Sequence, residues 1–338
     1  MIRLKKEYKK ALAGYKFVDL FCGIGGFHAA LKDFGAECVF ASDINLEAQK
    51  IYRANFRIEP KGDIRDMKEV NIPKHDILCA GFPCQAFSIS GSQQGFNNVK
   101  SGRLFYEIIR IAEYHKSKLI LLENVANIEF HDNGKTIDII ISELHKIGYR
   151  AYKQSLNAAD YNVPQSRKRL YIVAFRENMK IREFRFPEHI KLKRNVEAIL
   201  EAGNSESARK SIINREYHIR DSFEVIEKEC KKPCIRIGEI GLGRQGERIY
   251  SIKGCATTLS ASGGGVGGRT GIYLINNQIR KLTPRECARL MGFPDKFVIA
   301  ETPNQAYQQF GNSVVVDVLQ HIIIEVIKTL LKESCYEK

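Results

Sequence analysis

The sequence predicts an α/β protein with a doubly wound, mostly parallel sheet and a smaller, irregular, β-rich second domain. From residue 15 to about residue 175, short apolar runs alternate with longer amphipathic stretches, which is the pattern of βαβ units. A glycine-rich turn follows the first apolar run, where sheets of this kind bind ligands. After about residue 185 the alternation ends and a basic, then glycine-rich segment begins, which indicates the second domain.

The elements of the first domain follow from this alternation. Short apolar runs bounded by turn residues favour buried strands, and apolar residues three to four apart favour helices. The predicted strands are 17–21, 38–41, 77–80, 119–122 and 170–175, and the predicted helices are 26–34, 46–55, 104–115 and 136–147. A further apolar-rich helix is predicted from near Val314.

Composition limits the classes of function. The chain has 338 residues, and 53 Lys and Arg against 39 Asp and Glu give a net charge of +14, which favours a polyanionic partner such as nucleic acid. The nine cysteines form no Cys-x-x-Cys pair and no metal-type group with histidine, so we expect reduced thiols, no metal and a cytoplasmic location. No segment approaches the length of a membrane span.

The turn after the first predicted strand is the candidate cofactor site. Its residues include Phe21, Gly23, Gly25 and Gly26, and glycines here allow a tight turn and close approach of a ligand to the backbone. An acidic residue about 20 positions further on is expected to accept from ribose hydroxyls, and Asp43 occupies that place. The Gly-x-Gly-Gly spacing favours a small adenosine-bearing cofactor over a pyrophosphate one. A glycine-rich turn without a ligand is the alternative.

A second cofactor contact is predicted near the third strand. Asp63 has the chemistry to accept a hydrogen bond from an exocyclic amine, and Ile64 follows it.

Cys84 is the candidate nucleophile. It follows Pro83 directly after the apolar run 77–80, so it is expected at the carboxyl end of a strand, where ligands bind in open α/β sheets. The alternative is a buried structural thiol. Two further charged groups are expected at the same sheet. The carboxylate of Glu123 follows the predicted strand 119–122, and the cations Arg167 and Arg169 precede the predicted strand 170–175.

These motifs and their order resemble the DNA cytosine-5 methyltransferase family. The resemblance is carried by 19–27, 81–88, 123–125, 165–169, 280–294 and 305–314, and it is greatest to small bacterial restriction-modification enzymes of the HhaI type, through 246–251 and 258–261. It implies a Rossmann-like, S-adenosyl-L-methionine-dependent methyltransferase fold, a double-stranded DNA substrate and S-adenosyl-L-homocysteine as product.

The resemblance also assigns roles. Cys84 is expected to add to carbon 6 of a flipped-out cytosine, Glu123 to protonate or hydrogen-bond ring nitrogen 3, and Arg167 to hold the base carbonyl. The polar segment 88–103 is a candidate lid. The cofactor contacts that the resemblance implies are Phe21, Gly23, Gly25, Gly26, Asp43, Ile44, Asp63, Ile64, Pro83, Leu104 and Asn312. The DNA contacts that it implies are Ser90, Gln245, Arg248 and Thr258.

Further expectations concern domains and partners. Residues 1–190 and 304–338 are expected to form the catalytic domain and 191–303 the target-recognition domain, which we expect to read a GCGC-containing site. A monomer on DNA is expected, with a cognate restriction endonuclease that acts on the same site without direct contact. The alternatives are a transfer RNA cytosine-5 methyltransferase, a catalytically silent DNA-binding relative and a nicotinamide oxidoreductase.

Overall fold

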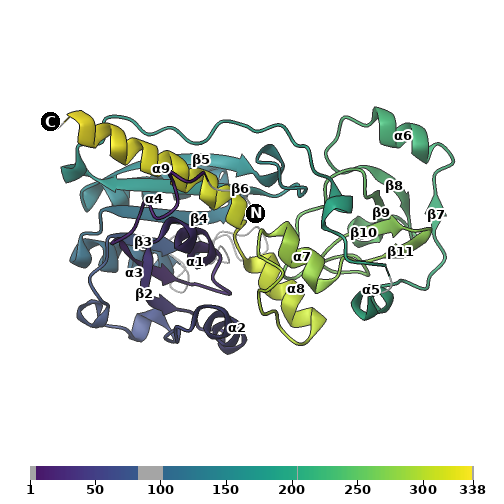
Figure 1. Ribbon diagram of the computed structural model, residues 1–338, viewed down its shortest axis with the longest axis horizontal. Coiled ribbons are helices and arrows are strands. Elements are labelled where there is room, and N and C mark those ends of the chain that lie inside the picture. Colours follow the sequence, from purple (N-terminus) through teal and green to yellow (C-terminus); the bar gives the residue numbers. More distant parts are fainter. Residues whose placement is uncertain (1–4, 83–101, 204, 337–338) are drawn as a thin grey trace. The chain divides into compact units, whose positions relative to one another are not determined.

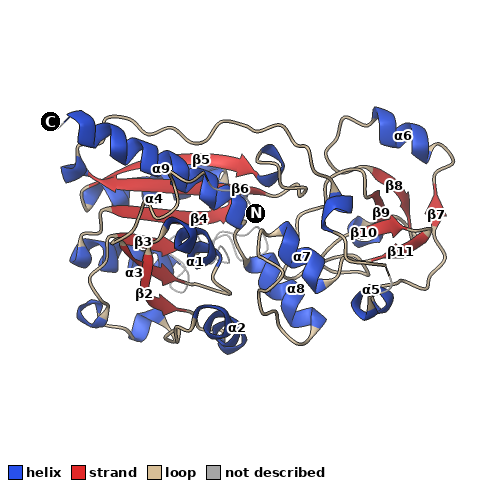
Figure 2. Cartoon of the chain, viewed as in Figure 1, coloured by secondary structure: helices blue, strands red, loops and turns tan. Residues whose placement is uncertain are grey.

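The computed structural model describes residues 5–82, 102–203 and 205–336, which fall into two compact units (Figure 1). The sheet unit comprises the described residues within Ile2–Leu156, Lys168–Glu188 and Leu319–Lys338. The second unit comprises Asn157–Arg167 and the described residues of His189–Val318. Helices and strands alternate in the first, and short strands joined by loops characterise the second (Figure 2).

A six-stranded sheet forms the centre of the sheet unit, with the strand order β2-β1-β3-β4-β6-β5. Parallel pairing joins β1 to β2, β1 to β3 and β3 to β4, whereas β6 runs antiparallel to β4. The strands are β1 (Lys16–Leu20), β2 (Glu37–Ser42), β3 (Ile77–Ala80), β4 (Leu119–Val125), β5 (Tyr149–Asn157) and β6 (Lys168–Arg176). The predicted mostly parallel α/β sheet is therefore confirmed.

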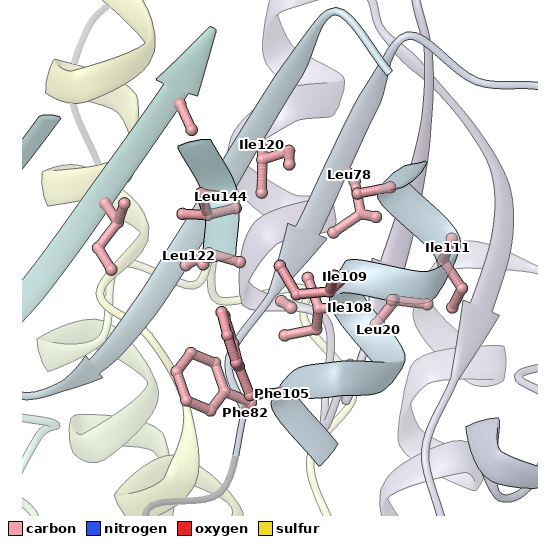
Figure 3. Close-up of a cluster of buried hydrophobic side chains, with 14 of the residues drawn as sticks. Leu20, Leu78, Phe82, Phe105, Ile108, Ile109, Ile111, Ile120, Leu122 and Leu144 are labelled. Atoms are coloured by element: carbon pink, nitrogen blue, oxygen red, sulfur yellow. The ribbon is translucent and has the colours of Figure 1, made fainter. Parts of the chain in front are cut away.

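Helices of the sheet unit follow the predicted amphipathic stretches. They are α1 (Gly26–Leu31), α2 (Leu46–Phe56), α3 (Gly102–His115) and α4 (Lys135–Lys146). The apolar face of α3 packs on the sheet: Phe105, Ile108 and Ile111 are fully buried in one cluster with Leu78 and Ile120 (Figure 3). This burial of apolar surface holds β3 and β4 firmly, and their carboxyl ends carry the candidate catalytic groups.

β5 is the strand that the sequence pattern did not predict. Polar residues interrupt its sequence, Tyr-Arg-Ala-Tyr-Lys-Gln-Ser-Leu-Asn, and most of its residues are exposed or partly exposed. Because β5 lies at the edge of the sheet, it lacks the apolar run that marks a strand buried on both faces.

The second unit has its own five-stranded sheet, with the order β11-β10-β9-β8-β7 and a core that includes Ile237, Ile249 and Ile272. Its strands are β7 (His218–Ile219), β8 (Arg236–Glu239), β9 (Arg248–Ser251), β10 (Ile272–Ile275) and β11 (Gln278–Arg280). Its helices are α5 (Glu206–Lys210), α6 (Phe223–Glu229), α7 (Pro284–Leu290) and α8 (Pro303–Asn312). The helix predicted from near Val314 is α9 (Val316–Tyr336), most of which belongs to the sheet unit.

The division into units differs from the predicted domains 1–190, 191–303 and 304–338. Residues 157–167 and 304–318 group with the second unit. The reason is a set of internal hydrogen bonds: the buried Arg167 guanidinium donates to the carbonyls of Leu259, Gly311 and Ser313 at 2.7–2.9 Å. Composition changes along the sequence do not reveal such long-range bonds.

Candidate active site

The carboxyl ends of β3 and β4 bring the candidate catalytic segments to one edge of the sheet. Parallel register pairs Ala80 with Leu122, so the residues that follow each of them emerge side by side. The antiparallel strand β6 begins at this edge, and Arg169 pairs with Val125. Three chain segments far apart in the sequence therefore meet here.

Glu123 and Arg169 form the ion pair of this edge. The Arg169 Nε lies 3.3 Å from Glu123 Oε1, and the side chains are 15% and 10% exposed. Arg169 Nη1 also donates to the Lys168 carbonyl at 2.9 Å, which fixes the direction of the guanidinium. A carboxylate and a guanidinium held together in a mostly buried position can bind both a donor and an acceptor of a planar base.

Arg167 occupies a different place from the one predicted. It precedes β6, is 2% exposed, and donates to the three backbone carbonyls named above within the second unit. Its guanidinium therefore stabilises that unit, and Arg169 is the cation that contacts Glu123. The role of holding the base carbonyl fits Arg169 better than Arg167.

Asn124 is a site residue that the sequence reading missed. Its Nδ2 donates to the Phe82 carbonyl at 3.1 Å, and Oδ1 accepts from the Val125 amide at 2.8 Å. Phe82 immediately precedes Pro83 and the candidate nucleophile Cys84. Pro83, Cys84 and Ser90 lie outside the described residues, as does the candidate lid up to residue 101. Asn124 thus ties the end of β4 to Phe82, two residues before the candidate nucleophile Cys84.

Replacing Asn124 by Ala is expected to lower turnover. Loss of one partner of a buried hydrogen bond costs about 1–3 kcal/mol. We therefore expect a fall in kcat of about tenfold or more, because Phe82, which precedes Pro83 and Cys84, loses its hydrogen bond to Asn124. The KM for the expected cofactor should change little, because β3 separates β4 from the strand that precedes the glycine turn. Steady-state kinetics with both substrates varied checks this, and a changed donor KM with unaltered kcat would contradict it.

The glycine turn holds Asp43 in place. Asp43 Oδ2 accepts from the Gly23 amide at 2.7 Å, and Oδ1 accepts from the Asn45 amide at 2.8 Å. Burial raises the pKa of Asp43, and these two backbone hydrogen bonds oppose that rise. Positive φ angles at Phe21 (54°), Gly23 (52°) and Gly25 (87°) fold the chain tightly enough to present the amide of Gly23.

The other predicted cofactor residues are distributed as follows. Ile44 follows Asp43 and is 70% exposed, and Asp63 caps a short 3-10 helix, where Arg65 donates to its carboxylate and lowers its pKa. Ile64 is buried in the core of the sheet unit and Leu104 lies partly buried on α3. Asn312 is exposed at the end of α8, in the second unit.

A cluster of buried polar and aromatic side chains packs against the glycine turn. A Cβ at Gly25 would lie 2.2 Å from the Phe56 ring, so only glycine fits there. His28 stacks on Phe56 with ring centroids 3.9 Å apart, and its Nδ1 is hydrogen-bonded to the Tyr52 hydroxyl at 2.8 Å. Burial raises the pKa of the nearby Asp19 well above its usual range. The glycine turn therefore packs tightly against these buried side chains.

His28 predicts a pH dependence of stability. Burial lowers its pKa from 6.5 to about 3, so below pH 6.5 the unfolded chain binds a proton that the folded chain excludes. The free energy of unfolding should consequently fall as the pH drops from 6.5 toward 3. His28→Asn is expected to reduce this slope, by up to about 1.4 kcal/mol per pH unit. Urea denaturation across this range measures it, with His218→Asn on exposed β7 as the control, and an unchanged slope in His28→Asn would disprove the assignment.

The predicted DNA contacts lie on the second unit. Gln245 and Thr258 are exposed, and the Thr258 hydroxyl donates to the Ser166 carbonyl. Arg248 is partly buried at the start of β9, with its Nε 3.4 Å from the Gly243 carbonyl. Gln245 and Arg248 stand at the two ends of one short turn, between β8 and β9.

Across residues 5–82, 102–203 and 205–336, no three His, Cys, Asp or Glu side chains group as metal ligands. In the same part of the chain no helix combines the length and apolarity that a membrane crossing requires.

Similarity to known proteins covers nearly the whole chain. The family model described as C-5 cytosine-specific DNA methylase matches residues 15–328. The Type II methyltransferase M.HhaI of Haemophilus parahaemolyticus is 46% identical over 322 residues, which cover 95% of this chain and 96% of that protein. The Type II methyltransferase M.DsaV of Dactylococcopsis salina is 39% identical over 308 residues, 91% of this chain and 84% of that protein.

Solved structures show the same fold. The Entamoeba histolytica methyltransferase EhMeth matches with a TM-score of 0.71 at 20% identity, over 94% of this chain and 98% of that one. The S. pombe Dnmt2 methyltransferase matches with a TM-score of 0.69 at 21% identity, over 94% and 99%. At these identities the likeness concerns the fold.

Proposed function

The chain belongs to the C-5 cytosine-specific DNA methylase family, and from that premise we propose how its residues divide the work of methylating DNA. The protein is a DNA cytosine-5 methyltransferase, and the family uses S-adenosyl-L-methionine as methyl donor. The sheet unit is assigned donor binding and chemistry, and the second unit is assigned DNA recognition. The observation that carries this assignment is the Glu123–Arg169 pair at the edge into which the Cys84 segment leads.

The chemistry begins with the thiolate of Cys84. Carbon 5 of cytosine is a poor nucleophile until the Cys84 sulfur bonds to carbon 6, which breaks the ring's aromaticity. Glu123 donates a proton or hydrogen bond to nitrogen 3, and Arg169 donates to the base carbonyl, so that negative charge does not build up on the ring. S-adenosyl-L-methionine supplies an electrophilic methyl group on a sulfonium. After carbon 5 has taken the methyl group, loss of its proton to a base expels the Cys84 thiolate and restores the aromatic ring.

The glycine turn suits an adenosine-bearing donor. Asp43 is partly buried and its oxygens are aligned by backbone amides, which leaves lone pairs for ribose hydroxyls. A Cβ at Gly23 would meet no atom within 4 Å, so the space beside the turn is open for a ligand. Ile44, 70% exposed next to Asp43, offers an apolar surface for adenine. We also assign donor contacts to the other predicted cofactor residues of the sheet unit.

The substrate is duplex DNA, whose target cytosine must leave the stack before a thiol can approach the ring face. We assign Ser90 and Gln245 to the space that the base vacates, and Arg248 and Thr258 to contacts with the DNA. Arginine pairs well with guanine in the major groove, and the resemblance of 246–251 and 258–261 supports a GCGC-containing site.

The relatives support a role in restriction-modification. Both relatives named above are Type II methyltransferases, so we propose that the protein protects DNA from a cognate endonuclease that acts on the same site without direct contact. We further propose that it acts as a monomer, in the cytoplasm where the DNA lies. The transfer RNA enzyme, the silent DNA-binding relative and the oxidoreductase are not favoured by the family match.

Bisulfite sequencing tests the proposal directly. A plasmid library and bulk transfer RNA are each incubated with the protein and S-adenosyl-L-methionine, and then sequenced. We expect protected cytosines within one short DNA motif containing GCGC, and none in transfer RNA. Modification of transfer RNA alone would overturn the substrate, and a different DNA motif would overturn the site but not the activity.

A further inference from the structure

The turn between β8 and β9, residues 240–247, is closed by hydrogen bonds. The Ile240 amide donates to the Glu247 carbonyl at 2.8 Å, and the Glu247 amide donates to the Arg244 carbonyl at 2.8 Å. The Glu247 side chain accepts from the Arg244 amide at 2.9 Å. These bonds hold the exposed Gln245 on a fixed backbone, so its position is set by the turn as a whole.

A second segment, residues 256–271, is anchored independently within the same unit. The Leu259 amide donates to the side chain of the fully buried Gln165 at 3.2 Å, and Arg167 donates to the Leu259 carbonyl at 2.9 Å. The Ser260 amide donates to the Arg269 carbonyl at 3.0 Å, which closes the segment into a loop. The exposed Ser262 lies on this loop.

Glycine backbones meet where Gly246 of the turn contacts Gly264, Gly265 and Gly267 of the loop. The Gly267 amide donates to the Gly246 carbonyl at 2.8 Å. A Cβ at Gly246 would lie 2.4 Å from the Gly264 carbonyl oxygen, and a Cβ at Gly265 would lie 3.4 Å from the Gly246 Cα. The two segments approach this closely because no side chain separates them.

We propose that this backbone contact at Gly246 determines which DNA sequence the protein methylates. The inference rests on the proposed role of the second unit in DNA recognition. Neighbouring bases along a strand are spaced about 3.4 Å apart, so two independent loops would tolerate more than one alignment of their side chains on the bases. The glycine contact fixes the positions of Gln245 and Ser262 relative to each other, so that only one alignment of these side chains on the bases is possible.

Gly246→Ala is the test because its effect is local. Gly246 does not have a positive φ, so alanine suits its backbone, and the clash falls on the backbone of Gly264 and Gly265. Gly264→Ala is the matched control: it lies in the facing loop, and its Cβ would meet nothing within 4 Å. Methylation is measured by bisulfite sequencing of a library that contains the wild-type site and every variant differing from it by one base.

We expect Gly246→Ala to reduce the ratio of methylation at the wild-type site to that at single-base variants by about tenfold or more, since a shift of about 1 Å is enough to misplace a contact. Gly264→Ala should keep the wild-type ratio, and both should bind S-adenosyl-L-methionine normally. Should Gly246→Ala not accumulate as folded protein, Gly267→Ala replaces it, because its Cβ would lie 3.2 Å from the Gly246 carbonyl oxygen and its nearest neighbour is the Ile272 side chain, which can move.

The outcomes separate this inference from the proposed function. If folded Gly246→Ala kept the wild-type ratio of methylation, or lost methylation equally at all sites, the inference would be overturned. The proposed methyltransferase function would still stand. A wild-type protein that methylates no DNA would overturn the proposed function instead.

Discussion

Cys84→Ser is expected to abolish methyl transfer while DNA and S-adenosyl-L-methionine still bind. The substitution removes the nucleophile that activates carbon 5 and changes little volume, and a serine hydroxyl is almost entirely protonated at neutral pH. Transfer of a labelled methyl group to DNA measures the loss. Cys230→Ser, at a partly exposed thiol of the second unit, is the matched control and should retain full turnover.

A trapping experiment tests the covalent step separately. When fluorine replaces the proton at carbon 5, the base that normally removes the proton has nothing to abstract, so the Cys84 adduct persists. With S-adenosyl-L-methionine present, wild-type protein should methylate carbon 5 and remain in a denaturant-resistant complex with a duplex containing 5-fluorocytosine, and Cys84→Ser should form none. Normal turnover in Cys84→Ser would exclude this mechanism.

Glu123→Gln is expected to have the next largest effect. Glutamine keeps the shape of the side chain but cannot ionise, so it removes the carboxyl group that serves nitrogen 3 and lies 3.3 Å from Arg169. General acid catalysis contributes about 10²- to 10⁴-fold, so the single-turnover rate should fall by a factor in this range. Donor affinity should stay close to wild type.

The control for Glu123→Gln is the same substitution at Glu129. Glu129 ends the short 3-10 helix after β4, and its carboxylate accepts a hydrogen bond from the Ser155 hydroxyl on β5. We expect wild-type rates for Glu129→Gln in rapid-quench measurements. If both variants lost activity equally, the effect of Glu123 would have to be attributed to the fold of this region.

The sequence predicts the buried strands of the sheet unit well, and the reason is physical. Runs such as 77–80 are apolar because both faces of a central strand are covered, so each run marks a strand. The edge strand β5 lacks such a run. The family was also predictable and is confirmed, because its motifs are contiguous in sequence.

Contacts that depend on long-range geometry could not be predicted. The bond from Asn124 to the Phe82 carbonyl depends on the register of β3 and β4, which no local pattern encodes. Arg167 and Arg169 are two residues apart, and side chains so spaced share a face only within a strand. β6 begins at Lys168, so this rule does not extend to Arg167, which turns into the second unit instead.

The grouping of residues 157–167 with the second unit has a consequence for protein engineering. A chimera that exchanges only 191–303 for the recognition segment of a relative would leave Gln165 and Arg167 facing foreign backbone at Leu259. The transplanted segment would then lack the donors that anchor it. A functional graft should therefore carry residues 157–167 together with 189–318, as one module encoded by two separate stretches of the gene.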